Sequence, residues 1–432
     1  MANRKAGSIK TIIVQECYQE IPICDNDPHA LTNREANEMA SYIKQSNLDN
    51  CNFVWGRQSL RIINYVGYIR LSTVAIEILP KTGTATGEHS RKVLLDMLYH
   101  SRYCEVDYSA ISELKDVKHN LFEIFGYLFA ENLKKELLRG AAASYMLVEN
   151  NLTVLKGRLQ VSKQISNLCR GTGKAYCQYD EFTIDNALNR ILKWAALYLI
   201  HKVRNERTVA LLKFCLLHFD EVDGREVSSV HLDRVKFDRT NQRFLNAFTL
   251  AKMFLLDRSP ISSTGTNQNF ALLFSMSDLF EKYISVVMKR YIDYQVYAQH
   301  AKYKLLVNER TERGTYSLQP DLVLCDNECE KLIVDTKWKA ISDSSFRHGV
   351  KREDYFQMYA YLTRYSTVDT VILLYPHNSN ITRGSAQMLE SYYLEDQPYK
   401  RLRVYTVDYE CIEKTVEDLK KIVSENMANI YL

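Results

Sequence analysis

The stretch SLQPDLVLCDNECEKLIVDTKWK, residues 317–339, decides the fold of the C-terminal part of this chain. It places Asp321 after Pro320, runs through an apolar strand and a turn, and ends in a second apolar strand that closes on Asp335 and Lys337. Successive side chains of a strand point to opposite faces, so Asp335 and Lys337 share one face. A hairpin joining the two strands would bring Asp321 beside Asp335.

Two converging carboxylates suit Mg²⁺, or alternatively Mn²⁺, because both ions prefer oxygen ligands. The bound ion would activate water and stabilise charge on a phosphate under attack. Lys337 would hold the attacking water or neutralise the developing negative charge. We therefore predict Asp321 and Asp335 as catalytic metal ligands and Lys337 as a catalytic residue in phosphodiester cleavage.

An Asp-x-Lys tripeptide alone says little, because the chain contains two others, Asp116–Lys118 and Asp418–Lys420, both in helical surroundings. The structural alternative is a solvated ion pair worth under about 1 kcal/mol. Three features favour a site: the end of an apolar strand, the Pro-Asp strand start upstream, and a following helix. On that helix Gln357 and Tyr361 are four residues apart and therefore share a face.

Other residues near this motif are candidates for ligand or DNA contact. Glu281, on a predicted helix with apolar neighbours, is either a further metal ligand or part of a surface Glu/Lys face. A basic loop follows the second strand, and its side chains either contact DNA phosphates or are solvated. The candidates for DNA contact are Lys339, Tyr361, Arg347, Lys351 and Arg352, with His348 in the same loop.

Composition limits the class of protein only broadly. The chain has 432 residues and a net charge of +4, which permits a nucleic-acid partner without arguing for one. The ten cysteines are scattered without a CxxC pair, which excludes the usual zinc spacings. No apolar run approaches the roughly 20 residues that span a membrane. With no secretory signal, we expect the cytoplasm.

One glycine-rich stretch resembles part of a phosphate-binding loop but lacks its key residues. In Gly171–Lys174, Leu168 stands where the earlier glycine is required and Ala175 replaces the hydroxyl residue. We therefore expect that this chain binds no nucleotide itself.

Hydrophobic patterning predicts a multidomain α+β fold with three parts: a β-rich domain over 1–150, a helical domain over 151–258 and an α/β domain over 259–432. A capping box at Thr32–Glu35 begins a helix that runs to about Gln45. The polar segment Ser259–Asn269 is the expected linker. Strands are expected over 8–14, 51–64, 65–79, 321–325, 331–338, 370–375 and 401–407, and as a pair over 143–148 and 153–160 around a turn at 149–151. Helices are expected over 91–101, 117–139, 186–203, 208–218, 241–256, 277–292 and 353–365, and from about 411.

These residues resemble a known family. Pro320-Asp321, Asp335-Thr336-Lys337 and Gln357-x-x-x-Tyr361 look like the PD-(D/E)xK nuclease fold, in the branch with a trailing Q-x-x-x-Y helix. The wider chain resembles the McrC family, the nuclease subunit of the McrBC modification-dependent (5-methylcytosine) restriction system. The stretches that carry this likeness are 66–70 (VGYIR), 76–81 (IEILPK), 155–159 (LKGRL), 185–193 (DNALNRILK) and 374–377 (LYPH).

The resemblance implies a function and a partner. It implies a Mg²⁺-dependent DNA endonuclease of a bacterial or archaeal type IV restriction complex, in which Gln357 is the helix-borne residue near the site and Glu281 falls at the acidic position of the first helix. The N-terminal half would dock into a hexameric McrB-like AAA+ ring and stimulate its GTP hydrolysis. The complex would cleave double-stranded DNA carrying modified cytosine. We place the ring contact in the first loops of the β-rich region, including Gly83–Gly87.

Two other hypotheses remain open on sequence alone. The first is that the chain is a stand-alone DNA repair or end-processing nuclease of the same fold, which would cut without a partner. The second is that it is a binding or assembly protein whose acidic residues have no catalytic role. The long β-rich N-terminal region favours the ring-dependent nuclease, because a repair nuclease needs no docking module.

Overall fold

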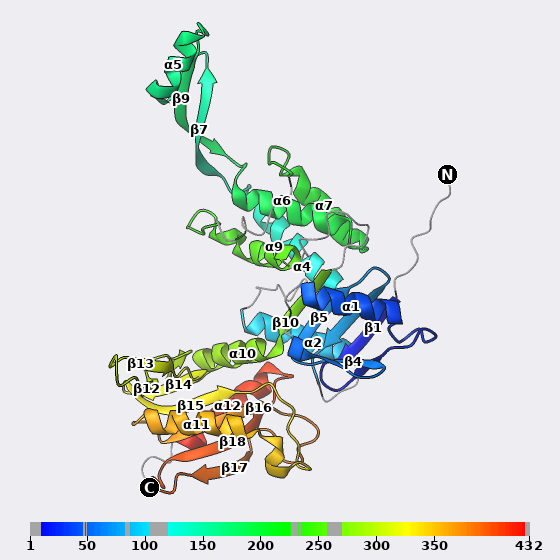
Figure 1. Ribbon diagram of the computed structural model, residues 1–432, viewed down its shortest axis with the longest axis vertical. Coiled ribbons are helices and arrows are strands. Elements are labelled where there is room, and N and C mark those ends of the chain that lie inside the picture. Colours follow the sequence, from blue (N-terminus) through cyan, green and yellow to red (C-terminus); the bar gives the residue numbers. More distant parts are fainter. Residues whose placement is uncertain are drawn as a thin grey trace. The chain divides into compact units, whose positions relative to one another are not determined.

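The computed structural model describes residues 10–427 apart from 46–47, 49, 83–86, 103–119, 226–231, 233–234 and 257–269. The chain divides into two compact units, Met1–Glu105 together with Ser259–Leu432, and Val106–Arg258. The chain contains several separate sheets together with many helices (Figure 1), so the predicted multidomain α+β class is confirmed.

The first unit contains a sheet built from both ends of the sequence. Its strand order is β1 (Lys10–Gln15), β6 (Val74–Leu79), β5 (Tyr65–Arg70) and β10 (Phe270–Ser275). Strands β1 and β6 are parallel, and the other pairs are antiparallel. A smaller sheet follows the order β2 (Glu20–Pro22), β4 (Ser59–Ile62) and β3 (Phe53–Trp55). The helices of this region are α1 (Asn33–Gln45), α2 (Gly87–His100) and the short η1 (Asn50–Asn52).

Helix α1 begins where the capping box predicts. The backbone N–H of Thr32 donates to Glu35 Oε2 at 2.9 Å, and the N–H of Glu35 donates to Thr32 Oγ1 at 3.2 Å. These reciprocal bonds satisfy backbone donors that have no partner within a helix. The helix then packs Met39, Tyr42 and Ile43 into a core shared with both sheets.

Strand β5 requires glycine at position 67. Gly67 has φ +134°, a conformation that side chains rarely adopt, and it pairs with β6 on one side and β10 on the other. A Cβ at this position would lie 1.9 Å from the backbone carbonyl oxygen of Leu272. The close approach of β10 therefore depends on the missing side chain.

Replacing Gly67 with alanine is expected to destabilise the protein by roughly 3 kcal/mol or more, because a backbone clash and an unfavourable φ add together. Urea unfolding monitored by circular dichroism measures this loss. Gly87→Ala is the control, since its added Cβ would meet Leu79 at an ordinary 3.6 Å. A midpoint for Gly67→Ala equal to that of the native chain would contradict the assignment.

The second sheet of this unit has the order β11-β14-β15-β16-β18-β17. Strands β14 and β15 form an antiparallel hairpin, β15, β16 and β18 run parallel, and β17 is antiparallel to β18. Its strands are β11 (Gln295–Ala298), β14 (Leu322–Asp326), β15 (Cys329–Thr336), β16 (Thr370–Pro376), β17 (Met388–Tyr393) and β18 (Arg401–Val407). A separate hairpin joins β12 (Lys304–Val307) and β13 (Gly314–Ser317).

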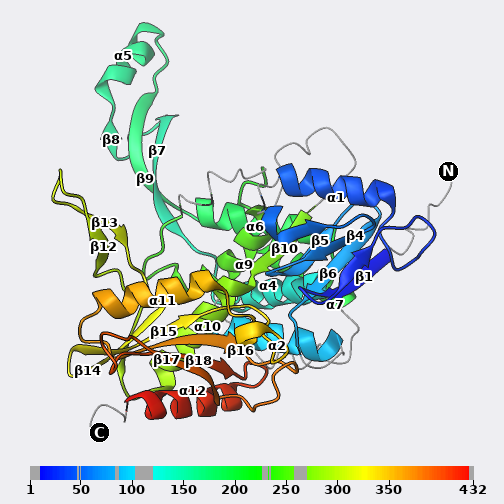
Figure 2. The same cartoon turned by 60° about the horizontal axis from the view of Figure 1, so that its bottom comes forward.

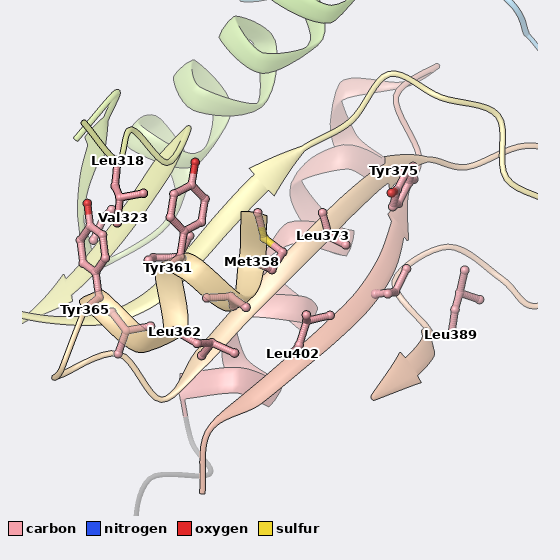
Figure 3. Packing of buried hydrophobic residues seen from close by; sticks show 14 of the residues in the cluster. Leu318, Val323, Met358, Tyr361, Leu362, Tyr365, Leu373, Tyr375, Leu389 and Leu402 are labelled. Atoms are coloured by element: carbon pink, nitrogen blue, oxygen red, sulfur yellow. The ribbon is translucent and has the colours of Figure 1, made fainter. Parts of the chain in front are cut away.

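Helices cover both faces of this sheet. Helix α11 (Arg352–Arg364) lies on one face, and α12 (Ile412–Met427) lies on the other together with α10 (Met276–Tyr291) (Figure 2). Figure 3 shows Met358 and Leu362 of α11 packed over Leu373 and Leu402 of the sheet. A short turn of helix, η4 (Phe346–Gly349), precedes α11. Strand alternation directs Asp335 and Lys337 toward the α11 face, and Trp338 toward the opposite face.

The second unit combines packed helices with a three-stranded arm. Helices α4 (Leu121–Leu137), α6 (Ala187–Ile200), α7 (Glu206–Leu217) and α9 (Leu245–Leu256), with the short η2 (Gln242–Phe244), pack together. The arm, residues 144–183, has the sheet order β7 (Ser144–Leu152), β9 (Ala175–Thr183) and β8 (Arg158–Leu159), with helix α5 (Val161–Cys169) against β9.

The predicted strand pair in this region is wrong. Residues 149–151 form no turn, because β7 continues through them to Leu152 and pairs along its length with β9. The segment expected as the second strand contributes only β8. Strand β9 was not predicted, because its polar run AYCQYDEFT shows no clean alternation. Pairing partners far apart in sequence decided the register here.

The compact units divide the chain differently from the predicted ranges 1–150, 151–258 and 259–432. Residues 120–150 fall in the unit with the middle helices, because α4 packs on α7 and α9 and β7 pairs with β9. Strand β10 pairs with β5, which joins the C-terminal range to the N-terminal sheet. The expected linker Ser259–Asn269 lies outside the described residues.

Most other predicted elements are confirmed to within a few residues. These are the strands now numbered β1, β3 to β6, β14 to β16 and β18, and the helices α1, α2, α4, α6, α7 and α9 to α12. Strands β2, β10, β11, β12, β13 and β17 and helix α5 were not predicted either. Within the described ranges, no helix combines the length and apolar character that crossing a membrane requires.

Candidate functional site

The hairpin β14–β15 brings the two predicted acids together. Leu322 pairs with Val334, so Asp321 and Asp335 take the next position at the end of the ladder. The backbone N–H and the hydroxyl of Thr336 both donate to Asp321 Oδ2, at 2.8 and 2.7 Å. These bonds hold the Asp321 carboxylate across from the end of β15 and leave its other oxygen outside this contact.

Asp335 is buried, and its close polar contact is an ion pair with Lys337. The residue is 1% exposed, and within the described part of the chain neither carboxylate oxygen has a hydrogen-bond donor in acceptable geometry. Burial, followed by the charge of Asp321, raises the pKa of Asp335 to about 7. A carboxylate buried this deeply costs free energy in the fold, and the nearby ammonium of Lys337 offsets part of that cost.

Lys337 lies between the acid and helix α11. Its ammonium is 2.5 Å from Asp335 Oδ2 and donates to Gln357 Oε1 at 3.0 Å. Burial is the largest single influence and lowers the pKa of Lys337, but the carboxylates of Asp335, Asp321 and Asp354 together raise it above its usual value. Gln357 in turn donates to the Tyr361 hydroxyl at 2.9 Å. The ion pair considered from the sequence is present, but it is largely buried and not solvated, since the Asp335 side chain is 1% exposed and the Lys337 side chain 18%.

The four residues Asp321, Asp335, Lys337 and Gln357 therefore meet at one edge of the sheet. Helix α11 presents Gln357 and Tyr361 on one face, as their spacing predicts. Tyr361 is buried in the core under this edge (Figure 3). Its contact to Gln357 makes it a support for that residue, and its role as a DNA contact stays a prediction.

Glu281, on α10, lies close enough to Asp321 to interact with it electrostatically. Burial and then the Asp321 carboxylate raise the pKa of Glu281, and its Oε1 accepts a hydrogen bond from Gln299. The backbone N–H of Gln299 donates to Asp321 O at 2.9 Å, so both residues belong to the same edge. The role of Glu281 as a metal ligand stays a prediction.

The donor set fits a hard divalent cation through two carboxylates. Among the described residues, no group of three or more His, Cys, Asp or Glu side chains is placed to hold a metal ion. Two carboxylates with the remaining positions taken by water and phosphate oxygens is, however, a common arrangement for Mg²⁺. Such an ion would be held by the Asp335 carboxylate and by the Asp321 oxygen that does not bind Thr336.

Lys339 is held by a partner that the sequence did not reveal. Its ammonium lies 2.8 Å from both carboxylate oxygens of Asp354, a buried residue in the first turn of α11. Tyr375 also donates to Asp354, at 3.2 Å. The predicted phosphate contact of Lys339 would therefore compete with this pair.

The basic loop is exposed apart from its histidine. The side chains of Arg347, Lys351 and Arg352 are exposed, and Arg352 lies over the ring of Phe356. His348 lies between two carboxylates, with Nδ1 3.1 Å from Asp343 and Nε2 3.4 Å from Glu390. The three exposed cations are free to face solvent or DNA phosphates, and both alternatives stand.

Sequence reasoning missed Thr336, Asp354 and Gln299. The sequence position of Thr336, between Asp335 and Lys337, could have indicated it, although its side chain points to the other face of the strand. Asp354 could have been found from its place one turn before Gln357 on the same helix. Gln299 gave no signal, because its position depends on the turn between β11 and β12.

Comparison with protein families gives one match across most of the chain. The family model described as "McrBC 5-methylcytosine restriction system component" matches residues 60–376. A comparison with curated proteins gives no match.

Two solved structures from Thermococcus gammatolerans share the fold. A chain of the refined half-complex from the tetradecameric assembly of McrB AAA+ hexamers with bound McrC is 20% identical, with a TM-score of 0.71, and the match covers 96% of this chain and 99% of that one. A chain of the cryo-EM structure of the McrBC complex is 23% identical, with a TM-score of 0.52 over 66% of this chain and 89% of that one. The first likeness spans both compact units.

Proposed function

Because the chain belongs to the family of McrBC 5-methylcytosine restriction system components, we propose that it is the nuclease subunit of a GTP-dependent, modification-dependent restriction complex. The C-terminal sheet with its flanking helices would be a PD-(D/E)xK nuclease domain. The observation that carries this proposal is the cluster of the buried Asp335 carboxylate, the Asp321 carboxylate beside it and the Lys337 ammonium 2.5 Å from Asp335 Oδ2. A restriction subunit without chemistry would have no reason to keep such a costly group.

Asp321 and Asp335 would hold Mg²⁺, with Mn²⁺ as an alternative. The ion supplies Lewis acidity toward the phosphate and lowers the pKa of bound water. The chain positions both carboxylates by the β14–β15 ladder and by the two bonds from Thr336 to Asp321. Glu281, which lies near Asp321, would be a further ligand of the same ion.

Lys337 would neutralise charge on the phosphate or hold the attacking water. Its ammonium is fixed between Asp335 and Gln357, so it needs little reorganisation when negative charge develops. Gln357 and Tyr361 keep the ammonium from swinging toward solvent.

Gln357→Ala is expected to lower kcat for DNA cleavage at least about tenfold with little change in KM, because the ammonium of Lys337 loses its fixed direction. Single-turnover cleavage at saturating partner and Mg²⁺ measures the effect. Thr363→Ala, an exposed change on the same helix, is the control. A native cleavage rate for Gln357→Ala would show that the glutamine does not orient the lysine.

The chain would act with a hexameric AAA+ GTPase ring on double-stranded DNA carrying modified cytosine. The similar solved chain comes from an assembly of McrB AAA+ hexamers with bound McrC. The disrupted phosphate-loop pattern at Gly171–Lys174 suits a subunit that leaves GTP hydrolysis to its partner. Stimulation of that GTPase by this chain is part of the proposal.

The arm is the surface best suited to bind the ring. Several large apolar side chains on its strands, on α5 and in the segment between β7 and β8 are more than half exposed, which is unusual for a surface with no partner. These are Tyr145, Leu147, Val154, Leu155, Val161, Ile165, Leu168 and Phe182. This placement differs from our expectation of a contact through the loops around Gly83–Gly87, of which residues 83–86 lie outside the described part.

The proposal is tested by combining this chain with a McrB-like AAA+ GTPase ring. Cleavage of methylated linear DNA should require this chain, the ring, GTP and Mg²⁺ together, and unmethylated DNA should stay intact. Strong GTP-independent cutting by the purified chain alone would favour the stand-alone nuclease instead. Restriction that survives loss of the acids would favour an assembly protein.

A further inference from the structure

The strand that ends at Lys337 is fixed on its other face by a buried tryptophan. Trp338 follows the catalytic lysine and is 6% exposed. Its ring packs against Phe280 of α10, with centroids 5.3 Å apart, and against Tyr409, at 5.1 Å. The side chain therefore points away from Asp335 and toward the N-terminal sheet.

The Trp338 indole binds a buried glutamate from the far end of the sequence. Its Nε1–H donates to Glu16 Oε1 at 2.8 Å, and Glu16 is 1% exposed at the end of β1. Lys81, 4% exposed, lies 3.7 Å from the same oxygen and 4.7 Å from the centroid of the Trp338 ring. Glu16, Lys81 and Trp338 thus form one buried junction.

The parallel pairing of β1 and β6 builds this junction. Gln15 pairs with Leu79, and the N–H of Glu16 donates to Leu79 O at 2.9 Å. Glu16 and Lys81 consequently emerge at the same end of the two strands. The Tyr409 hydroxyl donates to the carbonyl oxygen of Lys81, which ties the loop after β18 to the same point.

Asn64 links the junction to helix α10. Its backbone N–H donates to Glu16 Oε2 at 3.1 Å. Its backbone and side-chain oxygens accept from the N–H groups of Met276 and Ser277, each at 2.8 Å. The start of the helix that carries Glu281 is therefore anchored at the same glutamate.

A buried ion pair is a poor way to gain stability, because the cost of removing two charges from water offsets much of their attraction. What a hydrogen-bonded buried pair does supply is one defined geometry, since any other arrangement leaves a charge unpaired. Lys337 directly precedes Trp338 in the chain, and its backbone N–H donates to Leu374 O at 2.9 Å. A small rotation of the strand end would move the ammonium away from Asp335 and Gln357.

We propose that Glu16, Lys81 and Trp338 are positioning residues that hold the end of β15, so that the N-terminal sheet sets the placement of Lys337 and Asp335. This inference rests on the proposed nuclease function. The three residues touch neither substrate nor metal and act only through the strand. Their contribution should appear in the rate of the chemical step and not in DNA affinity.

Trp338→Phe keeps an aromatic ring and removes the indole N–H. It is expected to lower kcat for ring-dependent cleavage about tenfold, with KM for DNA and stimulation of the partner GTPase unchanged. Trp55→Phe, an exposed tryptophan on β3, is the control and should cut at the native rate. The unchanged GTPase readout shows that the variant is folded and docked.

A second pair of variants keeps the test decisive if Trp338→Phe folds poorly. Glu16→Gln with Lys81→Met removes both charges but keeps an acceptor for the indole, whereas Glu16→Leu with Lys81→Met removes that acceptor as well. The first double variant should cut about tenfold faster than the second, at equal net charge. Equal rates for the two would overturn the positioning role, while a native chain that fails to cut would overturn the proposed function instead.

Discussion

Replacing Asp335 with asparagine is expected to reduce GTP-dependent cleavage of methylated DNA by at least about 10³-fold, because a metal site supplies several kcal/mol of transition-state stabilisation. Asparagine keeps the shape of the side chain, so packing around this buried position should survive. Binding to the partner ring and stimulation of its GTPase should remain native. Cleavage rates at saturating partner and Mg²⁺ measure the loss.

The chain supplies its own matched control for this change. Asp418 begins another Asp-x-Lys tripeptide, in helix α12, where its Oδ2 accepts the N–H of Asp408. Asp418→Asn should leave cleavage within about twofold of native, since an amide oxygen still accepts that bond. Cleavage that persists in Asp335→Asn would remove the central claim about this site.

Metal binding gives a readout that does not depend on cleavage. Mg²⁺ or Mn²⁺ should raise the thermal unfolding temperature of the native chain, because a ligand that binds the folded state stabilises it. The same ions should have no such effect on Asp335→Asn. Metal protection that is equal in both proteins would place the cation elsewhere.

Changing the arm should abolish assembly with the ring while leaving the site intact. Tyr145 and Phe182 lie directly opposite each other in the β7–β9 ladder, with ring centroids 5.1 Å apart, and are 73% and 64% exposed. Large exposed aromatic side chains are typical interface hot spots, worth about 2 kcal/mol each. Replacing both with serine is expected to weaken ring binding by roughly 10³-fold.

Size-exclusion chromatography with the ring, and stimulation of its GTPase, measure the effect of the arm variant. GTP-dependent cleavage should fall in parallel, because the nuclease is no longer delivered. The control is the double change Leu306→Ser and Tyr316→Ser in the β12–β13 hairpin, where both side chains are also exposed. If the arm variant binds the ring as tightly as the native chain, the arm is not the ring-binding surface.

Local patterns correctly predicted that Asp321, Asp335, Lys337 and Gln357 lie together, because these residues come from neighbouring elements. The β14–β15 hairpin needs only a short turn, so the ladder that brings Asp321 beside Asp335 follows from residues 321–335 alone. The helical spacing of Gln357 and Tyr361 is also a local property. The contact of Lys337 with Gln357 then depends only on how α11 packs on the same sheet.

Long-range pairing explains what the patterns missed. Strand β7 seemed able to fold back at residues 149–151, but β9 offers a longer ladder, and backbone hydrogen bonding over the whole strand outweighs a local turn. Strand β10 joined the N-terminal sheet for the same reason, since Gly67 permits a close approach across more than 200 residues of chain.

The sequence by itself determined the acids, the lysine and the helix that supports them, because strand and helix periodicities fix which side chains share a face within one short segment. Only the tertiary structure decided that Asp335 is buried, that Asp354 holds Lys339, and that Glu16 binds Trp338. Those contacts join segments whose separation no local pattern encodes. They depend on the packing of whole sheets, where the burial of apolar faces selects one arrangement and the charged groups must then find partners.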